Sequence, residues 1–321
     1  MSNQKIIRWG MIGCGNVTEV KSGPAFRLIE HSDLVAVMRR NEEKVRAYAK
    51  RHQVKKWFTN AEALVKDQEV DAVYIATPPA SHLEYTRLAA AHGKPVYVEK
   101  PMALNYGQCL EMIAVCKAAA VPLFVAYYRR TLPRFLAIKN LIDNGEIGNV
   151  RFVNVVMYKK AVTSSAAGWR VVPEISGGGL FVDLASHQLD LLQFYFGDII
   201  SADGYSAHQA AGYAAEDHVS GAFVFASGVH GTGIWNFAAY ADDDKTEIVG
   251  DKGKITFATF GNSPVEVVND RGSRLLDLPN PRHIQQPLIQ TVVDELRGVG
   301  RCPSTGITAA RTNRAMDLLR R

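Results

Sequence analysis

The sequence predicts an α/β protein built from two parts. In the first part, short apolar strands alternate with helical segments up to about residue 128, a pattern typical of a doubly wound parallel sheet. In the second part, long strands with turn residues between them occupy 201–278, which indicates a large, mostly antiparallel open sheet within an α+β domain. The length of 321 residues exceeds the roughly 250–300 residues of a single core. We therefore expect two domains, 1–126 and 127–321.

The first part contains helix signals in order along the chain. Gly23-Pro24 interrupts the helix that starts near Val17. Segment 42–52 carries acidic residues in its first turn and basic residues in its last turn, as the helix macrodipole favours. Ser81 can cap a helix that ends near residue 92, and Asn105 with Gln108 can form a capping box for a helix ending near residue 120. The expected strands are 6–12, 34–38, 72–77, 95–100 and 122–128.

The second part changes character after Tyr128. Segment 132–144 has helical spacing that Asn144-Gly145 can end, and segment 150–158 alternates like a half-buried strand. A long helix is expected over 180–196, followed by the strands of 201–278. Turn residues within that region stand at 227–228, 251–253 and 270–272. Two helices, 287–297 and 305–319, are expected to close the chain.

The composition excludes several classes of partner. The net charge of +5 comes from scattered Lys and Arg residues, so we expect no nucleic-acid surface. The four cysteines have no metal-ligand spacing, and we expect no metal site. Residues 1–5 lead into the first strand without a signal peptide, and no apolar run is long enough to span a membrane. These observations favour the cytoplasm and no membrane association.

A glycine-rich turn follows the first strand and opens a helix. Gly13 permits a tight turn, and Gly15 lets a pyrophosphate approach the backbone, while Asn16 and Val17 begin the helix beside it. Thr18 stands where a third glycine often occurs, so the pattern is imperfect. The strand–turn–helix context nevertheless indicates a dinucleotide-binding Rossmann domain, against the alternative of a purely structural turn.

The end of the second strand favours one form of the cofactor. NAD-binding sheets usually place an acidic residue there, on the ribose diol. This chain has Arg39 and Arg40 instead, and two guanidinium groups can hold a 2′-phosphate. The sequence therefore favours NADP(H), with NAD(H) possible. The alternative is a solvated basic loop.

Two further segments carry residues suited to proton transfer. Lys100 follows a buried strand, and the carboxyl ends of parallel strands are where ligands bind. Gly177 to Gly179 are expected to let a ligand approach the backbone closely, and they precede a helix in which Asp183 and His187 are four residues apart, on one face. Asp183 can orient the imidazole of His187, which is then suited to general acid–base catalysis, while Lys100 polarises the substrate oxygen. The alternative is an ordinary polar helix face.

These segments together resemble the glucose–fructose oxidoreductase / inositol dehydrogenase / rhizopine-catabolism (Gfo/Idh/MocA) family, and the resemblance extends over essentially the whole chain. It rests on the glycine turn, Thr77-Pro78 with His82, Glu99-Lys100-Pro101 and the helix 177–190. The resemblance implies catalytic roles for Lys100, Asp183 and His187, and cofactor-side positions for Thr77, Pro78, His82 and Glu99. Trp169-Arg170 resembles a pair near the cofactor. Tyr128 stands where many members have asparagine.

The resemblance also sets expectations for the substrate and the assembly. It implies an NAD(P)-dependent dehydrogenase or reductase that acts on a sugar, a polyol or a related cyclic alcohol or ketone. Besides Lys100, Asp183 and His187, the residues that could contact this substrate are Tyr128, Arg130, Arg134 and Tyr158. A non-catalytic dinucleotide sensor and an NAD-assisted glycosidase remain alternatives. One bare face of the antiparallel sheet predicts a homo-oligomer, a dimer or a tetramer.

Overall fold

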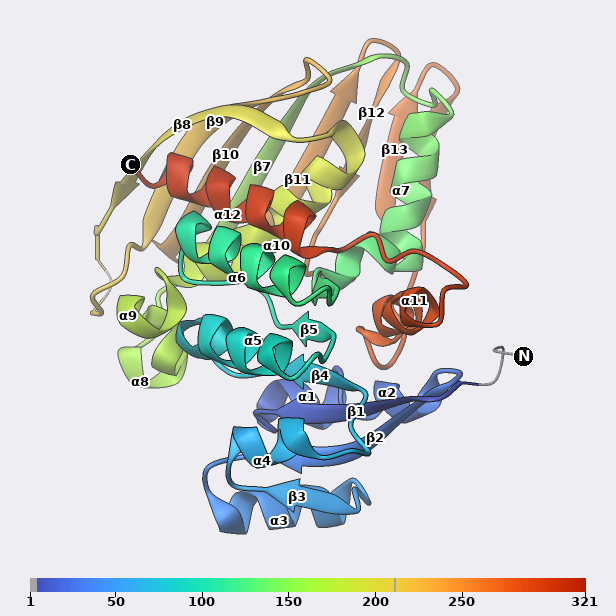
Figure 1. Ribbon diagram of the computed structural model, residues 1–321. Coiled ribbons are helices and arrows are strands. Elements are labelled where there is room, and N and C mark those ends of the chain that lie inside the picture. The colour runs from blue at the N-terminus through green and yellow to red at the C-terminus, as the bar shows by residue number, and fades with distance from the viewer. Residues whose placement is uncertain (1–4, 211) are drawn as a thin grey trace. The chain divides into compact units, whose positions relative to one another are not determined.

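The computed structural model describes residues 5–210 and 212–321 (Figure 1). Residues 1–4, on which the expected absence of a signal peptide partly depends, lie outside the described residues. The chain forms two compact units. Unit 1 holds the described residues of Met1–Ala103, Gly107–Thr131 and Pro281–Ala310. Unit 2 holds those of Leu104–Tyr106, Leu132–Asn280 and Arg311–Arg321. The expected domain division at residue 126 stays a prediction, and unit 1 also includes a segment from late in the chain.

Unit 1 contains a six-stranded parallel sheet in the order β3-β2-β1-β4-β5-β6. The strand order reverses between β1 and β4, as in a doubly wound dinucleotide-binding fold. The predicted fold class of the first part is thus confirmed. The strands are β1 (Ile7–Ile12), β2 (Ser32–Met38), β3 (Lys56–Phe58), β4 (Ala72–Ile75), β5 (Val96–Val98) and β6 (Leu123–Val125).

Helices connect these strands. They are α1 (Asn16–Val20), α2 (Ala25–Leu28), α3 (Glu42–Arg51), α4 (Ala61–Lys66), α5 (His82–Ala91) and α6 (Tyr106–Ala118). Unit 1 also contains α11 (Gln286–Leu296), from the late segment of the chain. Asn41 caps α3 by accepting a hydrogen bond from the Lys44 amide, and Asn60 caps α4 in the same way. Ser81 occupies the N-cap position of α5 but makes no capping bond, so that expectation was wrong. Its hydroxyl donates instead to Thr77 Oγ1 at 2.8 Å.

Unit 2 contains an eight-stranded sheet in the order β14-β13-β12-β11-β7-β10-β9-β8. Every neighbouring pair is antiparallel except β7 with β10, which is parallel. The predicted mostly antiparallel sheet is thus confirmed. The strands are β7 (Val150–Lys160), β8 (Ile199–Ala207), β9 (His218–Phe225), β10 (His230–Ala239), β11 (Asp243–Gly250), β12 (Gly253–Phe257), β13 (Val265–Asn269) and β14 (Gly272–Leu276).

One long helix, α10 (Leu180–Phe196), packs against β9 and β10 along one face of this sheet (Figure 1). The ring of Trp235 on β10 meets Phe181 edge to face at 5.2 Å between centroids, and its indole N–H donates to Gln188 at 2.7 Å. Residues of β7 and β10 with the opposite alternation, such as Phe152 and Ile234, are about two-fifths exposed. The other helices are α7 (Pro133–Asp143), α8 (Ser164–Ala167), α9 (Pro173–Ser176) and α12 (Gly306–Leu319), whose last residues belong to unit 2.

Candidate functional site

The glycine turn after β1 is closed on one side and open on the other. Gly13 has φ +95°, and a Cβ there would lie 2.6 Å from Thr77 Cγ2 and 2.9 Å from the Ala76 carbonyl carbon. A Cβ on Gly15 would meet no atom within 4 Å. Gly13 is therefore required by the protein itself, whereas the backbone at Gly15 is accessible to a ligand. Helix α1 spans five residues, so its macrodipole adds little, and the backbone of the turn would hold an anion.

The arginines after β2 lie beside this turn. Arg39 Nη1 donates to the Cys14 carbonyl oxygen at 3.0 Å, which holds the guanidinium over the loop between Gly13 and Gly15. Arg40 is exposed, and the first acidic side chain beyond it, Glu42, is exposed in the first turn of α3. The position at which NAD-binding sheets usually carry a ribose-binding carboxylate thus holds two cationic side chains.

His82 links two segments at the carboxyl edge of the parallel sheet. Its ring nitrogens lie 2.8 Å from the Thr77 carbonyl oxygen and 3.1 Å from the Met102 carbonyl oxygen. Burial lowers the pKa of the imidazole, although both neighbouring carbonyls favour its charged form. A neutral imidazole donates from one nitrogen only, so the tautomer decides which carbonyl it bonds. His82 thereby connects the Thr77-Pro78 turn to the segment that follows Lys100.

Glu99 is buried and bonded within unit 1. Its Oε1 accepts hydrogen bonds from Tyr74 Oη at 2.5 Å and from Gln285 Nε2 at 2.7 Å, and its Oε2 accepts from the Lys100 amide at 3.3 Å. Gln285 in turn accepts from Tyr97 Oη at 3.0 Å. Burial and the Glu99 carboxylate raise the pKa of Tyr74 well above its usual value, so the phenol remains a donor. These bonds hold the end of β5, where Lys100 follows.

Tyr128 lies on the adjacent strand end. Strands β5 and β6 pair in parallel, and the Ala126 amide donates to the Val98 carbonyl at 2.9 Å, so the segments after them run side by side. Burial would raise the pKa of the Tyr128 phenol, but the charges of Arg129, Lys21 and Lys100 outweigh it and lower the pKa. Tyr128 is therefore a buried phenol in cationic surroundings, on the same edge as Lys100.

The remaining expected substrate contacts are Arg130, Arg134 and Tyr158, and the structure gives each of them neighbours within its own unit. Arg130 is buried in unit 1 and donates to the Pro303 carbonyl at 3.0 Å, and Arg134 is buried in unit 2 and donates to the Ser263 carbonyl at 2.6 Å. Tyr158 pairs with Asn236, one residue beyond the Met157–Trp235 pair that faces α10. Strand alternation therefore turns Tyr158 to the other face of the sheet and argues against its expected place near His187.

Helix α10 carries Asp183 and His187 in unit 2. His187 is buried, and its ring meets Phe260 edge to face at 5.7 Å. Asp183 Oδ2 accepts a hydrogen bond from Arg170 Nε at 3.2 Å, and the Arg170 guanidinium lies 4.8 Å from the centre of the Trp169 ring. The structure thus brings the Trp169-Arg170 pair to Asp183. Of the three expected catalytic residues, Lys100 belongs to unit 1, whereas Asp183 and His187 belong to unit 2.

The three glycines before α10 have a different role from the expected one. We interpreted them from the sequence as room for a ligand, but the space beside each is filled by the chain. A Cβ on Gly177, which has φ +84°, would lie 2.6 Å from the Leu104 carbonyl oxygen. On Gly178 it would lie 2.3 Å from Arg320 Nη1, and on Gly179 it would lie 2.7 Å from the Glu216 carbonyl oxygen. The glycines therefore serve internal packing.

Sequence reasoning missed three residues that support these elements, namely Gln285, Glu216 and Arg320. Each contacts a segment far away in the chain, and no local motif marks any of them.

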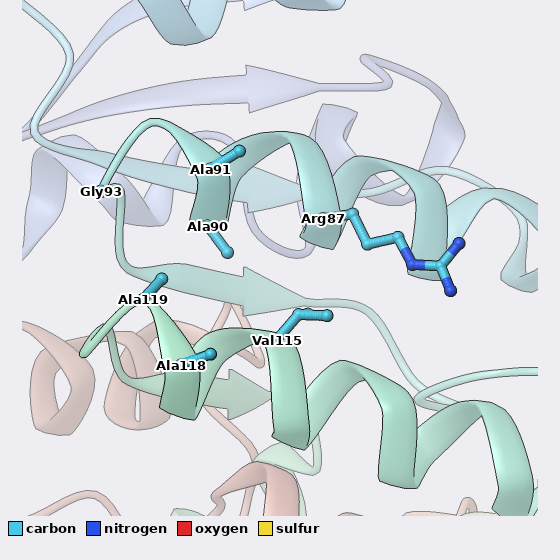
Figure 2. A pocket seen from close by; sticks show the side chains of 7 residues that line it. All are labelled: Arg87, Ala90, Ala91, Gly93, Val115, Ala118 and Ala119. Carbon is cyan, nitrogen blue, oxygen red and sulfur yellow. The ribbon is translucent and has the colours of Figure 1, made fainter.

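One cavity lies beside α10, and another lies away from the predicted site residues. In unit 2, a cavity of about 720 Å³ adjoins α10. Its lining combines basic and apolar side chains, with Lys159, Lys160, Arg170, Leu180 and Leu184 among them. In unit 1, a cavity of about 580 Å³ lies between α5 and α6. Figure 2 shows that its walls are mainly small side chains, and none of the predicted site residues lines it.

Within residues 5–210 and 212–321, no group of three or more His, Cys, Asp or Glu side chains is arranged to hold a metal ion. In the same described part of the chain, no helix has the length and apolar character needed to cross a membrane.

The two sheets define the fold class, a Rossmann-like parallel sheet followed in the chain by a large, mostly antiparallel sheet, and the comparisons with known proteins identify the family. Residues 7–127 match the oxidoreductase family with an NAD-binding Rossmann fold, and residues 135–256 match the GFO/IDH/MocA C-terminal domain. The chain belongs to the GFO/IDH/MocA family, as its motifs predicted, and is an oxidoreductase.

Named relatives extend over nearly the whole chain. Oxidoreductase P35 of Formosa agariphila is 44% identical over 316 residues, which are 97% of this chain and 98% of that protein. The 1,5-anhydro-D-fructose reductase of Ensifer adhaerens is 28% identical, over 93% of this chain and 91% of its own. A structure of levoglucosan dehydrogenase with NADH and levoglucosan has a TM-score of 0.85 at 20% identity, and covers 98% of this chain and 96% of its own. That likeness shows a shared fold.

Proposed function

We propose that the protein transfers a hydride between a nicotinamide cofactor and a sugar, a polyol or a related cyclic alcohol or ketone. The observation that carries this proposal is the position of Lys100. It follows β5 at the ligand-binding edge of the nucleotide fold, directly after a carboxylate that three donors hold in place. The Ensifer relative is named for 1,5-anhydro-D-fructose, and the levoglucosan dehydrogenase structure contains levoglucosan. Both compounds are sugar derivatives, which supports this substrate class.

The residues of the chain would divide the proton chemistry between them. Lys100 would donate a hydrogen bond to the substrate oxygen and stabilise negative charge that develops there. His187 would accept the proton of the substrate hydroxyl in oxidation and return it in reduction. Asp183, one turn earlier on α10, would orient the imidazole while Arg170 holds one of its carboxylate oxygens. The nicotinamide, when bound, supplies or accepts the hydride.

The glycine turn fits a dinucleotide, because the backbone at Gly15 is open while Gly13 is packed. Gly13, Gly15, Asn16 and Val17 would line the pyrophosphate, and Thr77 and Pro78 would lie on the nicotinamide side. His82 and Glu99 would act there by holding the neighbouring backbone, since their polar atoms bond within the protein. Trp169 and Arg170, which belong to unit 2, would be further cofactor-binding residues.

We infer a preference for NADP(H) over NAD(H). Arg39 is already held over the glycine turn by the Cys14 carbonyl, and Arg40 is exposed beside it, so both could bind a 2′-phosphate. An Arg39→Ala, Arg40→Ala double variant should lose affinity for NADP(H) and keep its affinity for NAD(H). Titration of each cofactor against intrinsic fluorescence measures both. An unchanged ratio of the two affinities would remove the assignment.

The partly apolar outer face of the sheet in unit 2 supports a homo-oligomer, a dimer or a tetramer. Phe152 and Ile234 are about two-fifths exposed on this face. Light scattering at micromolar concentration should give a multiple of the monomer mass of 35.3 kDa. A monomer would contradict the proposal. The four cysteines are buried thiols that do not form disulfides, which supports a reducing compartment, and we infer the cytoplasm.

The decisive experiment is the near-ultraviolet absorbance of the nicotinamide. The protein is incubated with NADP or NAD and a panel of sugars and polyols, and with the reduced cofactors and the corresponding ketones. We expect turnover that is lost in His187→Ala and retained in His230→Gln, whose histidine is exposed on β10. Cofactor binding without absorbance change, together with cleavage of a glycoside, would instead favour the NAD-assisted glycosidase.

A further inference from the structure

The C-terminal end of the chain reaches the turn from which α10 begins. Arg320 Nη1 donates to the Gly177 carbonyl oxygen at 2.7 Å and lies 3.5 Å from Glu216 Oε1. Its Nη2 lies 3.2 Å from Asp317 Oδ1. The Arg320 and Glu216 side chains are 19% and 16% exposed, so water screens this ion pair only in part. We call Arg320, Glu216 and Asp317 the C-terminal clamp.

The clamp replaces a capping side chain that α10 lacks. The N-cap residue of α10 is Gly179, which has no side chain that could make a capping bond. The Gly179 amide donates instead to Glu216 Oε1 at 3.3 Å. A carboxylate at the N-terminus of a helix of 17 residues also interacts favourably with the macrodipole. Arg320 holds that carboxylate and the Gly177 carbonyl at the same time.

Only glycine fits at position 178 beside the C-terminal clamp. A Cβ on Gly178 would lie 2.3 Å from Arg320 Nη1 and 2.9 Å from Glu216 Oε1. The clamp therefore occupies the space that a side chain at this position would take. Tight packing of this kind restricts the direction in which α10 leaves the turn.

The end of α12 is itself held against unit 2, so Arg320 approaches the turn from a fixed place. Gly204 on β8 and Gly221 on β9 leave room for Leu319, whose carbonyl oxygen and Cδ2 would lie 2.5 Å and 2.6 Å from their added Cβ atoms. Further along, Thr312 bonds to Gln193 at 3.0 Å and to Asp190 at 3.4 Å. Residues 311–321 thus contact the turn before α10 and the second half of α10.

We propose that Arg320 is a positioning residue for α10, which acts through Gly177–Gly179 to set where Asp183 and His187 lie. This inference rests on the function proposed above. Asp183 stands in the first turn of α10, and its amide bonds to the Gly179 carbonyl at 3.4 Å. A shift of the turn therefore moves Asp183 first and His187 one turn later. A misplacement of about 1 Å in a catalytic group can cost about 10²-fold in rate.

The test compares Arg320→Met with Arg321→Met in the chain of 321 residues. Arg321 is exposed, so its replacement removes the same charge from the same end of the chain without touching the turn. We expect kcat to fall by about 10²-fold in Arg320→Met, with the KM of the cofactor unchanged. The pH profile of kcat should also shift, because the environment of His187 changes. Arg320→Lys should recover part of the loss, since lysine keeps the charge but not the planar fork.

Hydrogen exchange of the amides of 177–186 gives a second readout that does not need a substrate. Faster exchange in Arg320→Met than in Arg321→Met, with equal melting temperatures, supports the proposal. Equal exchange, equal kcat and equal pH profiles in the two variants would overturn it. A loss of kcat that only follows a loss of folded protein, with an unchanged pH profile, would also overturn it. If the unaltered protein turns over no substrate, the proposed function fails, while the exchange result still decides the role of the clamp.

Discussion

Gln285 offers a sharp test of how the end of β5 is held. Its side chain is fully buried, donates to the Glu99 carboxylate at 2.7 Å and accepts from Tyr97 Oη at 3.0 Å. Leucine has a similar size and neither polar group. The Gln285→Leu variant would therefore lose a hydrogen bond to a buried charge and leave a buried hydroxyl without its acceptor.

The structure allows the cost to be worked out. A hydrogen bond to a charged group contributes about 1.5–3 kcal/mol, and an unsatisfied buried donor costs about 1–3 kcal/mol. The two losses sum to about 2.5–6 kcal/mol, and the extra apolar burial of leucine offsets about 1.6 kcal/mol, so we expect the free energy of unfolding to fall by roughly 1–4 kcal/mol. Gln290→Leu is the matched control, because Gln290 lies on α11, which Gln285 precedes, and its bond from the Glu30 amide is exposed while its bond to Asp294 is only partly buried. Its expected cost is about 1 kcal/mol.

Equilibrium unfolding in guanidinium chloride, followed by circular dichroism, measures both variants. The midpoint of the transition that includes unit 1 should move much further for Gln285→Leu than for Gln290→Leu. Equal shifts would refute the reasoning, because they would mean that the Glu99 carboxylate does not depend on this donor.

Two further predictions concern the glycine turn and the edge beside Lys100. Gly13→Ala should cost about 1–3 kcal/mol in stability, because residue 13 has a φ of +95° and a Cβ there would contact Thr77. Gly15→Ala should fold normally and bind dinucleotide more weakly, because its Cβ would meet no protein atom. Thermal unfolding and cofactor titration separate the two variants, and equal stability losses would contradict this prediction. The Tyr128 phenol should ionise below the usual range, because Arg129, Lys21 and Lys100 outweigh burial and lower its pKa. The lowered pKa of Tyr128 contributes stability in full above about pH 10, the pKa of a tyrosine in the unfolded chain. This contribution is lost as the pH falls through the lowered pKa of Tyr128 in the folded protein. The absorbance of phenolate, followed against pH, measures the titration of Tyr128 as the difference between the unaltered protein and Tyr128→Phe, with Tyr127→Phe as the control. A pKa of Tyr128 in the usual range would refute the cationic environment.

The long helix α10 shows what local sequence can predict. Its expected bounds and its observed bounds agree, Leu180–Phe196, because glycines stand directly before and after an uninterrupted helical pattern. Strand β3 and helix α4 were not predicted, since a three-residue edge strand carries almost no periodic signal. The Ser81 cap was predicted wrongly, because its hydroxyl bonds to Thr77 and to the Pro78 carbonyl instead.

The candidate site divides in the same way. The glycine turn, the strand-end lysine and the helix with Asp183 and His187 could be found from sequence, because each is a local pattern whose spacing has a direct geometric meaning. The role of the three glycines before α10 could not, since their neighbours come from distant segments. A glycine that admits a ligand and a glycine that admits an arginine look the same in one sequence.

The sequence by itself determined the fold class and the family, and it pointed to the candidate residues for the chemistry. It could do so because hydrophobic period, turn residues and motif spacing act over a few residues. Only the tertiary structure decided how those residues are held: Gln285 reaches Glu99 across 186 positions of the chain, and Arg320 reaches Gly177 across 143. Such pairs form because the folded backbone brings a buried carboxylate or carbonyl next to a donor, and burial then makes an unpaired group too costly to leave.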